Sequence, residues 1–189
     1  MNGLLIILSG PSGVGKGTVR KVLVQDESLN LAYSISMTTR GPRNGEVEGK
    51  DYFFVTKEKF LEALQKNELL EHARFVDNYY GTPKDYVQKL REQGKNVILE
   101  IETNGAREVI KKTKGDKGVI SIFIMPPSFE ELRSRIEKRK TEPERIINER
   151  LEKAKKEIGI KDFYQYSVTN NTPEQCAEDI KKIIVEHLK

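Results

Sequence analysis

The sequence predicts an α/β fold in which helices flank a parallel β-sheet, with a small strand-rich insert and a helical lid. Three nearly unbroken apolar runs, at residues 4–8, 96–101 and 119–125, are rich in Ile, Leu and Val. Such runs are typical of strands that are covered on both faces, as in a parallel sheet. Amphipathic helical patterns follow each run, which favours strands joined by crossover helices.

Three helix starts are marked by a Ser or Thr whose hydroxyl can accept a hydrogen bond from the next turn. These are Thr82, Ser128 and Thr172. Thr82 is followed by Pro83, a favoured first-turn residue, and the pair predicts a helix through about residue 92. At Ser128 and Thr172 a Glu or Gln follows three residues later, which is the spacing of a capping box.

Residues 33–83 interrupt the alternation of strands and helices. This stretch contains turn formers, two closely spaced arginines and alternating aromatic residues, with one helical pattern at about 57–66. We therefore divide the chain into a core, residues 1–32 and 84–189, and an insert, residues 33–83.

A polar, irregular stretch at residues 139–145 (RKTEPER) separates two helical patterns in the second half of the chain. Mobile lids over active sites are often built this way. We therefore expect a lid at about residues 126–157, within the core.

Composition favours a globular protein of the cell interior. The chain has 189 residues, a net charge of +4 and 37% hydrophobic residues, and no stretch comes near the roughly 18 consecutive apolar residues that span a membrane. Its one cysteine, Cys176, cannot form an internal disulfide, which fits a reducing, cytoplasmic location. Lys and Glu alternate along the predicted helices, so the positive charge indicates solvated helix faces and we expect no nucleic-acid partner.

Two residues that often carry chemistry are interpreted as structural. Cys176 shares an apolar helical stripe with Ile180, Ile183 and Ile184, which predicts a core position. His72 has no partner histidine at a metal-ligand spacing.

The first apolar run leads directly into residues 10–16 (GPSGVGK), which match the phosphate-loop pattern G-x-x-x-x-G-K. Glycines permit positive φ angles and let successive backbone N–H groups approach phosphate oxygens. The helix that follows points its N-terminus at the anion, and Lys16 adds a positive charge. The motif predicts a P-loop NTPase core whose ATP-binding residues are Gly10, Pro11, Ser12, Gly13, Val14, Gly15, Lys16, Gly17 and Thr18.

The residue after the lysine is Gly17, where many phosphate loops have a Ser or Thr that contacts Mg²⁺. The hydroxyl comes one position later, at Thr18. We therefore expect Mg²⁺ to be held mainly by the nucleotide, water and carboxylates.

A second anion site is predicted in the insert. Arg40 and Arg43 lie three positions apart in a turn-rich segment, and two guanidinium groups can hold one phosphate. Ser36, Tyr52 and Tyr80 offer neutral donors that would complete the site. This site would hold the molecule that receives the phosphoryl group.

Several segments together resemble the guanylate kinase family, which phosphorylates GMP. They are SGPSGVGKGT, SISMTTRGPRNGEVEGKDYFF, ELLEHARFVDNYYGTP, VILEIETNGA, IMPPSFEELRSRIEKR and TEPERIINERLEKAKKE. They occur in order and at the family's spacing over nearly the whole chain. The pattern TTR-x-P-R-x-G-E followed by G-x-D-Y-x-F is far more specific than the phosphate loop alone.

The resemblance implies a GMP site within the insert and at the adjoining sheet edge. The residues at the matching positions are Ser36, Arg40, Arg43, Glu46, Tyr52, Glu71, Tyr80, Thr82 and Glu102. The arginines and tyrosines would hold the phosphate, while Glu71, Thr82 and Glu102 would read guanine. A carboxylate accepts from guanine N1–H and the 2-amino group at once, whereas adenine would leave it unpaired.

Glu100 and Glu102 follow a predicted buried strand, at the sheet edge where α/β folds bind ligands. The family usually carries aspartates at these two positions, so both side chains are one methylene longer. By resemblance Glu102 faces the base, while Glu100 and Thr18 lie close to Mg²⁺ rather than bonded to it.

The resemblance also implies lid arginines, namely Arg135, Arg139 and Arg150. Cations on a closing lid stabilise the charge of the transferring phosphoryl group and exclude water. The family commonly shows R-G-T-E, and the change to residues 139–142 (RKTE) followed by Pro143 would stiffen the lid. The residues expected to act in catalysis are Lys16, Arg40, Arg43, Arg135, Arg139 and Arg150.

The sequence is therefore interpreted as a kinase of purine nucleotide metabolism that catalyses ATP + GMP ⇌ ADP + GDP with Mg²⁺ carried by ATP. Asn170 matches a family position near the adenine of ATP. It stays open whether dGMP is a second acceptor. We expect a monomer or a homodimer. Two alternatives stay open: a guanylate-kinase-like binding module without activity, and a kinase for another nucleoside monophosphate. The intact phosphate loop argues against the first, and Glu71, Thr82 and Glu102 argue against the second.

Overall fold

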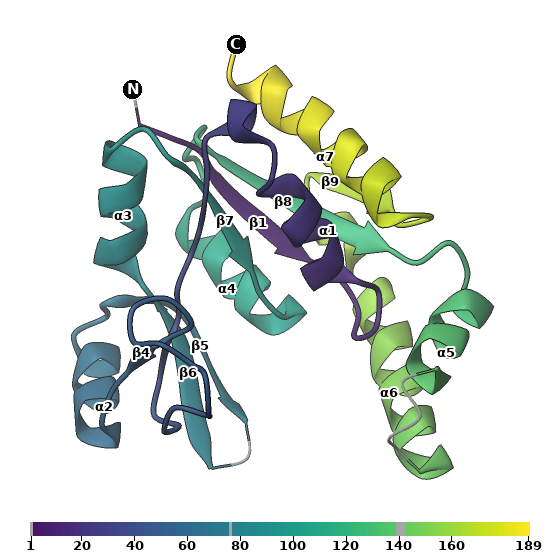
Figure 1. Ribbon diagram of the computed structural model, residues 1–189, viewed down its shortest axis with the longest axis horizontal. Coiled ribbons are helices and arrows are strands. Elements are labelled where there is room, and N and C mark those ends of the chain that lie inside the picture. The colour runs from purple at the N-terminus through teal and green to yellow at the C-terminus, as the bar shows by residue number, and fades with distance from the viewer. Residues whose placement is uncertain (1, 76, 139–142) are drawn as a thin grey trace.

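A five-stranded parallel sheet lies at the centre of the computed structural model, which describes residues 2–75, 77–138 and 143–189 (Figure 1). The strands are ordered β2-β7-β1-β8-β9. Their bounds are β1 Leu5–Ser9, β2 Leu31–Tyr33, β7 Asn96–Glu100, β8 Val119–Met125 and β9 Tyr166–Thr169. Leu5 of the central strand lies opposite Val97 on one side and Val119 on the other. Because the strands are parallel, their carboxyl ends meet at one edge, where such folds bind ligands.

Helices cover both faces of this sheet. They are α1 Lys16–Leu23, α3 Lys84–Glu92, α4 Thr103–Lys112 and α7 Pro173–His187, with 3₁₀ turns at Glu27–Leu29 and Lys161–Phe163. Residues of α1 and α7 pack against one face of the sheet, and residues of α3 and α4 pack against the other.

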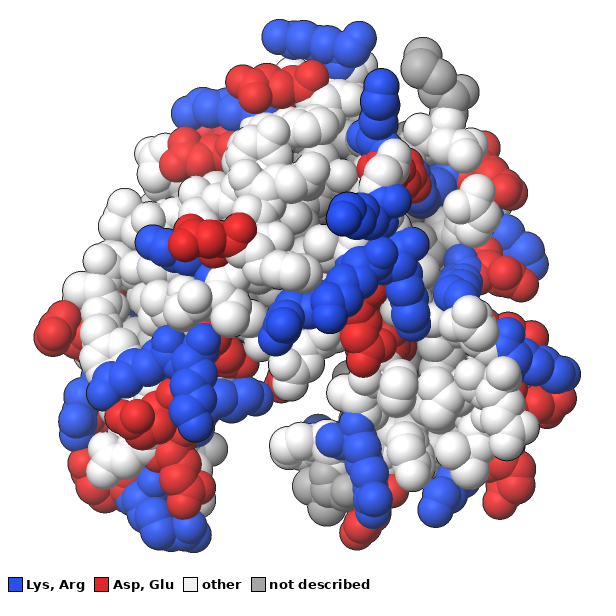
Figure 2. All heavy atoms as spheres, turned by 180° about the vertical axis from the view of Figure 1, so that it is seen from behind, with Lys and Arg blue, Asp and Glu red and all other residues white. Residues whose placement is uncertain are grey.

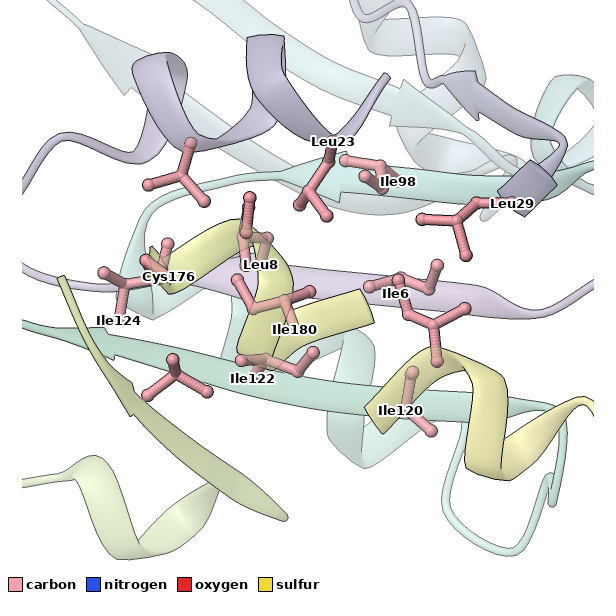
Figure 3. Packing of buried hydrophobic residues seen from close by; sticks show 14 of the residues in the cluster. Ile6, Leu8, Leu23, Leu29, Ile98, Ile120, Ile122, Ile124, Cys176 and Ile180 are labelled. Atoms are coloured by element: carbon pink, nitrogen blue, oxygen red, sulfur yellow. The ribbon is translucent and has the colours of Figure 1, made fainter. Parts of the chain in front are cut away.

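Alternation along β1 builds a hydrophobic core on each face. Ile6 and Leu8 lie in the core that Leu23 of α1 also enters (Figure 3). Leu5 and Ile7 lie in the opposite core, with α3 and α4. Successive strand side chains point to opposite faces, and here each face is covered. This two-sided burial is the reason why the strands read as unbroken apolar runs.

A second, mixed sheet lies beyond the carboxyl edge of the first. Its elements are β3 Met37–Thr38, β4 Phe53–Phe54, β5 Leu69–Phe75 and β6 Asn78–Pro83, with helix α2 Lys57–Gln65 beside them. The strand order is β4-β3-β6-β5. Phe60 of α2 packs with Ala63 and Leu69 in a separate small core.

Two helices, α5 Phe129–Glu137 and α6 Glu144–Ile158, project on the other side of the same edge (Figure 1). They pack on each other through Leu132, Ile136, Ile147 and Leu151. Seen from behind, the molecule is open between this helix pair and the second sheet (Figure 2). Arg139 and the rest of residues 139–142 lie outside the described residues.

The predicted strands agree with the structure to within a residue, and the run at 119–125 forms β8 over its full length. The helix predicted at about 57–66 is α2. The Ser128 hydroxyl accepts from the Glu131 N–H at 3.0 Å, and that of Thr172 accepts from the Gln175 N–H at 3.2 Å, so both predicted caps are confirmed.

The prediction that Thr82 caps a helix is wrong. Thr82 belongs to β6, and α3 begins at Lys84 after Pro83, with no side-chain cap. The Thr82 hydroxyl instead donates to the Glu71 carboxylate at 2.6 Å. A partner from a neighbouring strand therefore takes the hydroxyl that local spacing assigned to the helix.

Cys176 is fully buried in the core beside α1, as its helical stripe predicted. Across the described ranges of the chain, no helix combines the length and apolar character needed to cross a bilayer.

Candidate active site

The glycine-rich loop turns sharply between β1 and α1 at the carboxyl edge of the main sheet. Gly10, Gly13 and Gly15 have φ angles of +153°, +85° and +97°, a backbone region that L-residues rarely adopt. A Cβ on Gly10 would lie 2.5 Å from the Ile124 carbonyl oxygen of β8. The loop therefore packs tightly on the sheet at Gly10, a position that a larger residue could not occupy without displacing the backbone.

Lys16 opens α1 and folds back along the loop. Its Nζ donates to the carbonyl oxygens of Gly10 at 2.7 Å and of Pro11 at 3.2 Å. Burial lowers the pKa of the Lys16 ammonium, while the carboxylates of Glu100 and Glu157 act to raise it. A phosphate would replace the two carbonyls as the partner of this ammonium group and would add negative charge beside it.

A cavity of about 400 Å³ lies over the loop, and we call it the donor cavity because residues predicted to bind ATP line it. It is lined by loop residues and by side chains from β7, α1 and α6: Gly10, Ser12, Gly13, Gly15, Lys16, Gly17, Thr18, Lys21, Glu100, Glu102, Lys153 and Glu157. Of the predicted ATP residues, Pro11 and Val14 do not line it.

A second cavity of about 670 Å³ lies between the second sheet and α4, and we call it the acceptor cavity because residues predicted for the acceptor site line it. Ser36, Tyr52, Tyr80 and Glu71 line it, as the sequence predicted for an acceptor site. Glu100 and Glu102 line both cavities, so the donor and acceptor cavities meet at these carboxylates.

Glu71 is a buried carboxylate at the wall of the acceptor cavity. Its Oε1 accepts from the Thr82 hydroxyl at 2.6 Å, and its Oε2 lies where a Cβ on Gly105 of α4 would be 2.7 Å away. Burial raises the pKa of the Glu71 carboxyl, and the Thr82 hydroxyl partly offsets this. The strand register shifts between Leu69 and His72, and such irregularities redirect side chains next to active sites.

Arg40, Arg43 and Glu46 form a separate cluster beside the acceptor cavity. The Arg40 guanidinium donates two hydrogen bonds to the Glu46 carboxylate, at 2.8 and 2.9 Å, and lies 5.3 Å from the ring centre of Tyr52. Arg40 and the Arg43 backbone N–H hold the pKa of Glu46 at about 2. Glu46 thus orients Arg40 toward the tyrosines, while Arg43 is exposed.

Helices α5 and α6, where the sequence predicts a lid, contact the phosphate loop through two of the predicted arginines. Arg150 Nη2 of α6 donates to the Ser12 hydroxyl at 2.9 Å. Arg135 of α5 donates to the carbonyls of Val14, at 3.3 Å, and Asn170, at 3.0 Å. The third, Arg139, lies outside the described residues.

Asn170 lies behind the loop. Its Nδ2 donates to the Val14 carbonyl at 2.8 Å, the side chain is 2% exposed, and its Oδ1 has no hydrogen-bond partner among the described residues. This geometry lets Asn170 support the loop.

Sequence reasoning missed several charged residues at the two cavities, among them Arg20, Lys153 and Glu157. Arg20 of α1 holds Glu100 with an Nε–Oε2 distance of 2.7 Å and stacks 4.1 Å from the Tyr33 ring centre. Glu157 of α6 accepts from the Ser12 N–H at 3.3 Å, and Lys153 lines the donor cavity. The partners that bring them to the cavities, such as Glu100 for Arg20 and Ser12 for Glu157, are far away in the sequence. On α6, Lys153 and Glu157 look like ordinary members of a charged helix.

A phosphate loop at the carboxyl edge of a parallel sheet, opening toward a second cavity, defines the class: a P-loop enzyme built for phosphoryl transfer. The sequence model of the Guanylate kinase family matches residues 2–187, so the chain belongs to the guanylate kinase family. It is accordingly a nucleoside monophosphate kinase, an ATP:GMP phosphotransferase.

Curated relatives and solved structures agree. The chain is 54% identical to a guanylate kinase of Bacillus cereus, over 99% of this chain and 90% of the relative, and 50% identical to that of Bacillus subtilis, over 99% and 91%. The crystal structure of guanylate kinase from Anaplasma phagocytophilum matches with a TM-score of 0.74 and 36% identity, covering 100% of this chain and 88% of that one. The SH3-kinase fragment of tight junction protein 3, with a TM-score of 0.51 and 12% identity, shares the fold alone.

Proposed function

We propose that the donor cavity binds ATP on the phosphate loop and that the acceptor cavity binds GMP, with the phosphoryl group crossing beside Glu100 and Glu102. The observation that carries this proposal is the meeting of the two cavities at these carboxylates. Two nucleotides bound there would bring a donor and an acceptor phosphate together, which is most of what phosphoryl transfer requires.

The acceptor assignment rests on Glu71 and Thr82. The Thr82 hydroxyl donates to one oxygen of the Glu71 carboxylate and fixes the carboxylate plane. Guanine N1–H and the 2-amino group can then both donate to the carboxylate from the cavity. Glu102 would contribute a second acceptor. Adenine, which lacks both donors, would leave the cavity side of the buried Glu71 carboxylate without a hydrogen-bond donor.

The phosphate ends would be held by cations. Arg40, oriented by Glu46, would grip the GMP phosphate together with Arg43, Ser36, Tyr52 and Tyr80 after a small closure of the insert, residues 33–83. Lys16 and the lid arginines would stabilise the charge that spreads over the transferring group. No side-chain nucleophile is needed, because a GMP phosphate oxygen attacks the γ-phosphorus directly.

Kinases that use ATP generally need Mg²⁺, which bridges phosphate oxygens and neutralises their charge when bound. The Thr18 hydroxyl and three carboxylates line the donor cavity, and such hard oxygen donors suit Mg²⁺. Within residues 2–75, 77–138 and 143–189, no group of three or more His, Cys, Asp or Glu side chains is placed to hold a metal. Glu100 is also paired with Arg20. These residues fit an ion that arrives on the nucleotide, with Thr18 and Glu100 nearby.

The remaining assignments follow from the same proposal. The enzyme would be cytoplasmic and would act on free nucleotides, with no nucleic-acid or membrane partner. The single buried thiol and the charged helix faces support this assignment. The open acceptor cavity leaves dGMP as a second acceptor.

The test is acceptor selection in Glu71→Ala. We expect the preference for GMP over AMP, measured as a ratio of kcat/KM values in a competition assay, to fall by about 100-fold, since a bidentate base contact discriminates by roughly this factor. Glu68→Ala is the matched control, because Glu68 is an exposed carboxylate just before the same strand. Unchanged selection in Glu71→Ala would remove Glu71 from the base site.

A further inference from the structure

Lys153 occupies the junction between the lid helix α6 and the two nucleotide cavities. Its Nζ lies 3.3 Å from Glu102 Oε2 and 3.8 Å from Glu157 Oε1. It also lines the donor cavity, facing the space over the phosphate loop. The lid thus brings a lysine to the place where the two cavities meet.

The placement of Lys153 differs from that of its neighbour Lys155. Lys155 pairs with Glu152 at 2.8 Å, lies 5.1 Å from the ring centre of Phe129, and does not line the donor or the acceptor cavity. Two residues along one helix therefore give one ammonium group that faces the cavity and one that lies on the helix surface.

The groups around Lys153 are unequal partners. Glu157 is buried and already accepts hydrogen bonds from the Ser12 N–H and the Thr103 hydroxyl, each at 3.3 Å. Glu102 has a side chain that is 69% exposed, and its hold on Lys153 is a weak surface ion pair. Lys16 lies close enough for the Lys153 charge to lower its pKa, so both ammonium groups act on the same space.

We propose that Lys153 is a further lid cation that contacts the transferring phosphoryl group, and that Glu102 holds it aside until GMP occupies that carboxylate. The second half rests on the proposed assignment of Glu102 to the guanine base. When the base donates to Glu102, the Lys153 ammonium loses the nearer of its two carboxylate partners and turns to the phosphates in the donor cavity. Acceptor binding is thereby coupled to the charge that assists transfer.

Three variants test this proposal: Lys153→Gln, Lys153→Arg and the matched control Lys155→Gln. We expect Lys153→Gln to lower kcat for GMP phosphorylation by about tenfold or more, because it removes a cation from the transition state. Its Kd for GMP, measured by calorimetry, should stay within about threefold of the unchanged chain, since only a weak ion pair is lost. Lys153→Arg should recover most of kcat, and Lys155→Gln should match the unchanged chain.

The coupling is measured separately, as the affinity for the non-hydrolysable analogue AMP-PNP with and without saturating GMP. In the unchanged chain GMP should tighten AMP-PNP binding by up to about fivefold, and Lys153→Gln should lose this effect. Melting temperatures of all variants establish that they are folded.

Three results would overturn the proposal. They are a kcat for Lys153→Gln within twofold of the control, equal losses in Lys153→Gln and Lys153→Arg, and GMP coupling that survives in Lys153→Gln. If the unchanged chain preferred another nucleoside monophosphate, the assignment of Glu102 to guanine would fail. The effect of Lys153→Gln on kcat with that acceptor would still decide whether Lys153 contacts the transferring phosphoryl group.

Discussion

Burial at Glu71 favours the neutral carboxyl, because a charge loses hydration inside the protein. The pKa of Glu71 in the folded chain is accordingly raised above its ordinary value. Protonated Glu71 therefore stabilises the folded chain. This contribution is complete at pH values below the pKa of Glu71 in the unfolded chain, and it is lost as the pH rises through the pKa in the folded chain. The buried Glu71 carboxylate therefore destabilises the empty enzyme at neutral pH.

We predict that Glu71→Gln raises the melting temperature at pH 7 to 8 and that this gain shrinks as the pH falls toward about 4, where the unchanged carboxyl is also protonated. Melting curves across this range, with the exposed Glu68→Gln as control, measure the effect. A difference in melting temperature that does not change with pH would contradict the role of burial at this site.

Single residues also show which parts of the site could be predicted from the sequence. Lys16 was found because its motif is local, with loop and helix in one stretch of chain. The pairing of Arg20 with Glu100 spans 80 positions and leaves no local pattern. Whether a given Glu faces a cavity depends on the packing of several elements, as Glu157 illustrates.

At the scale of elements, the phosphate loop is held by contacts that only glycine permits. Gly10 combines a φ of +153° with a would-be Cβ contact of 2.5 Å to a backbone oxygen of β8. Gly115 has a φ of +93° but no atom within 4 Å of its would-be Cβ. A substitution at Gly115 therefore measures backbone strain alone, whereas one at Gly10 adds a steric clash with β8.

We predict that Gly10→Ala lowers the free energy of unfolding by about 3 kcal/mol or more and weakens ATP binding, because the loop must move away from β8. Gly115→Ala should lower the free energy of unfolding by only about 1–2 kcal/mol and leave ATP binding unchanged. Urea unfolding and ATP titration test both variants. Equal effects of the two substitutions would contradict the packing argument.

The strands of the main sheet could be predicted because strands that are buried on both faces consist of consecutive apolar residues. The second sheet could be predicted only as a strand-rich zone, since β3 and β4 have two residues each and take their order from partners distant in the chain. Thr82 was assigned to a helix for the same reason, because its partner Glu71 lies on another strand.

At the scale of the whole molecule, a continuous core supports the main sheet while the site is built at its edge. Cys176 lies fully buried in that core, and burial raises the pKa of its thiol to about 12. Reaction of a thiol requires both access and the thiolate. The single cysteine is therefore a reporter of unfolding.

We predict that Cys176 reacts with a thiol reagent at a rate that follows global unfolding, rising with urea in step with the loss of helical circular dichroism. Fast labelling in native buffer, before any change in the circular dichroism, would show that the core opens locally at α7.

The whole molecule places helices α5 and α6 and its second sheet on opposite sides of one sheet edge, with two cavities that meet between them. The most direct test is a coupled assay of ADP release with Mg-ATP and each of GMP, dGMP, AMP, CMP and UMP. We predict turnover with GMP, alone or together with dGMP. Turnover with AMP at a comparable kcat/KM, or none with GMP, would contradict the assignment of Glu71, Thr82 and Glu102 to the guanine base.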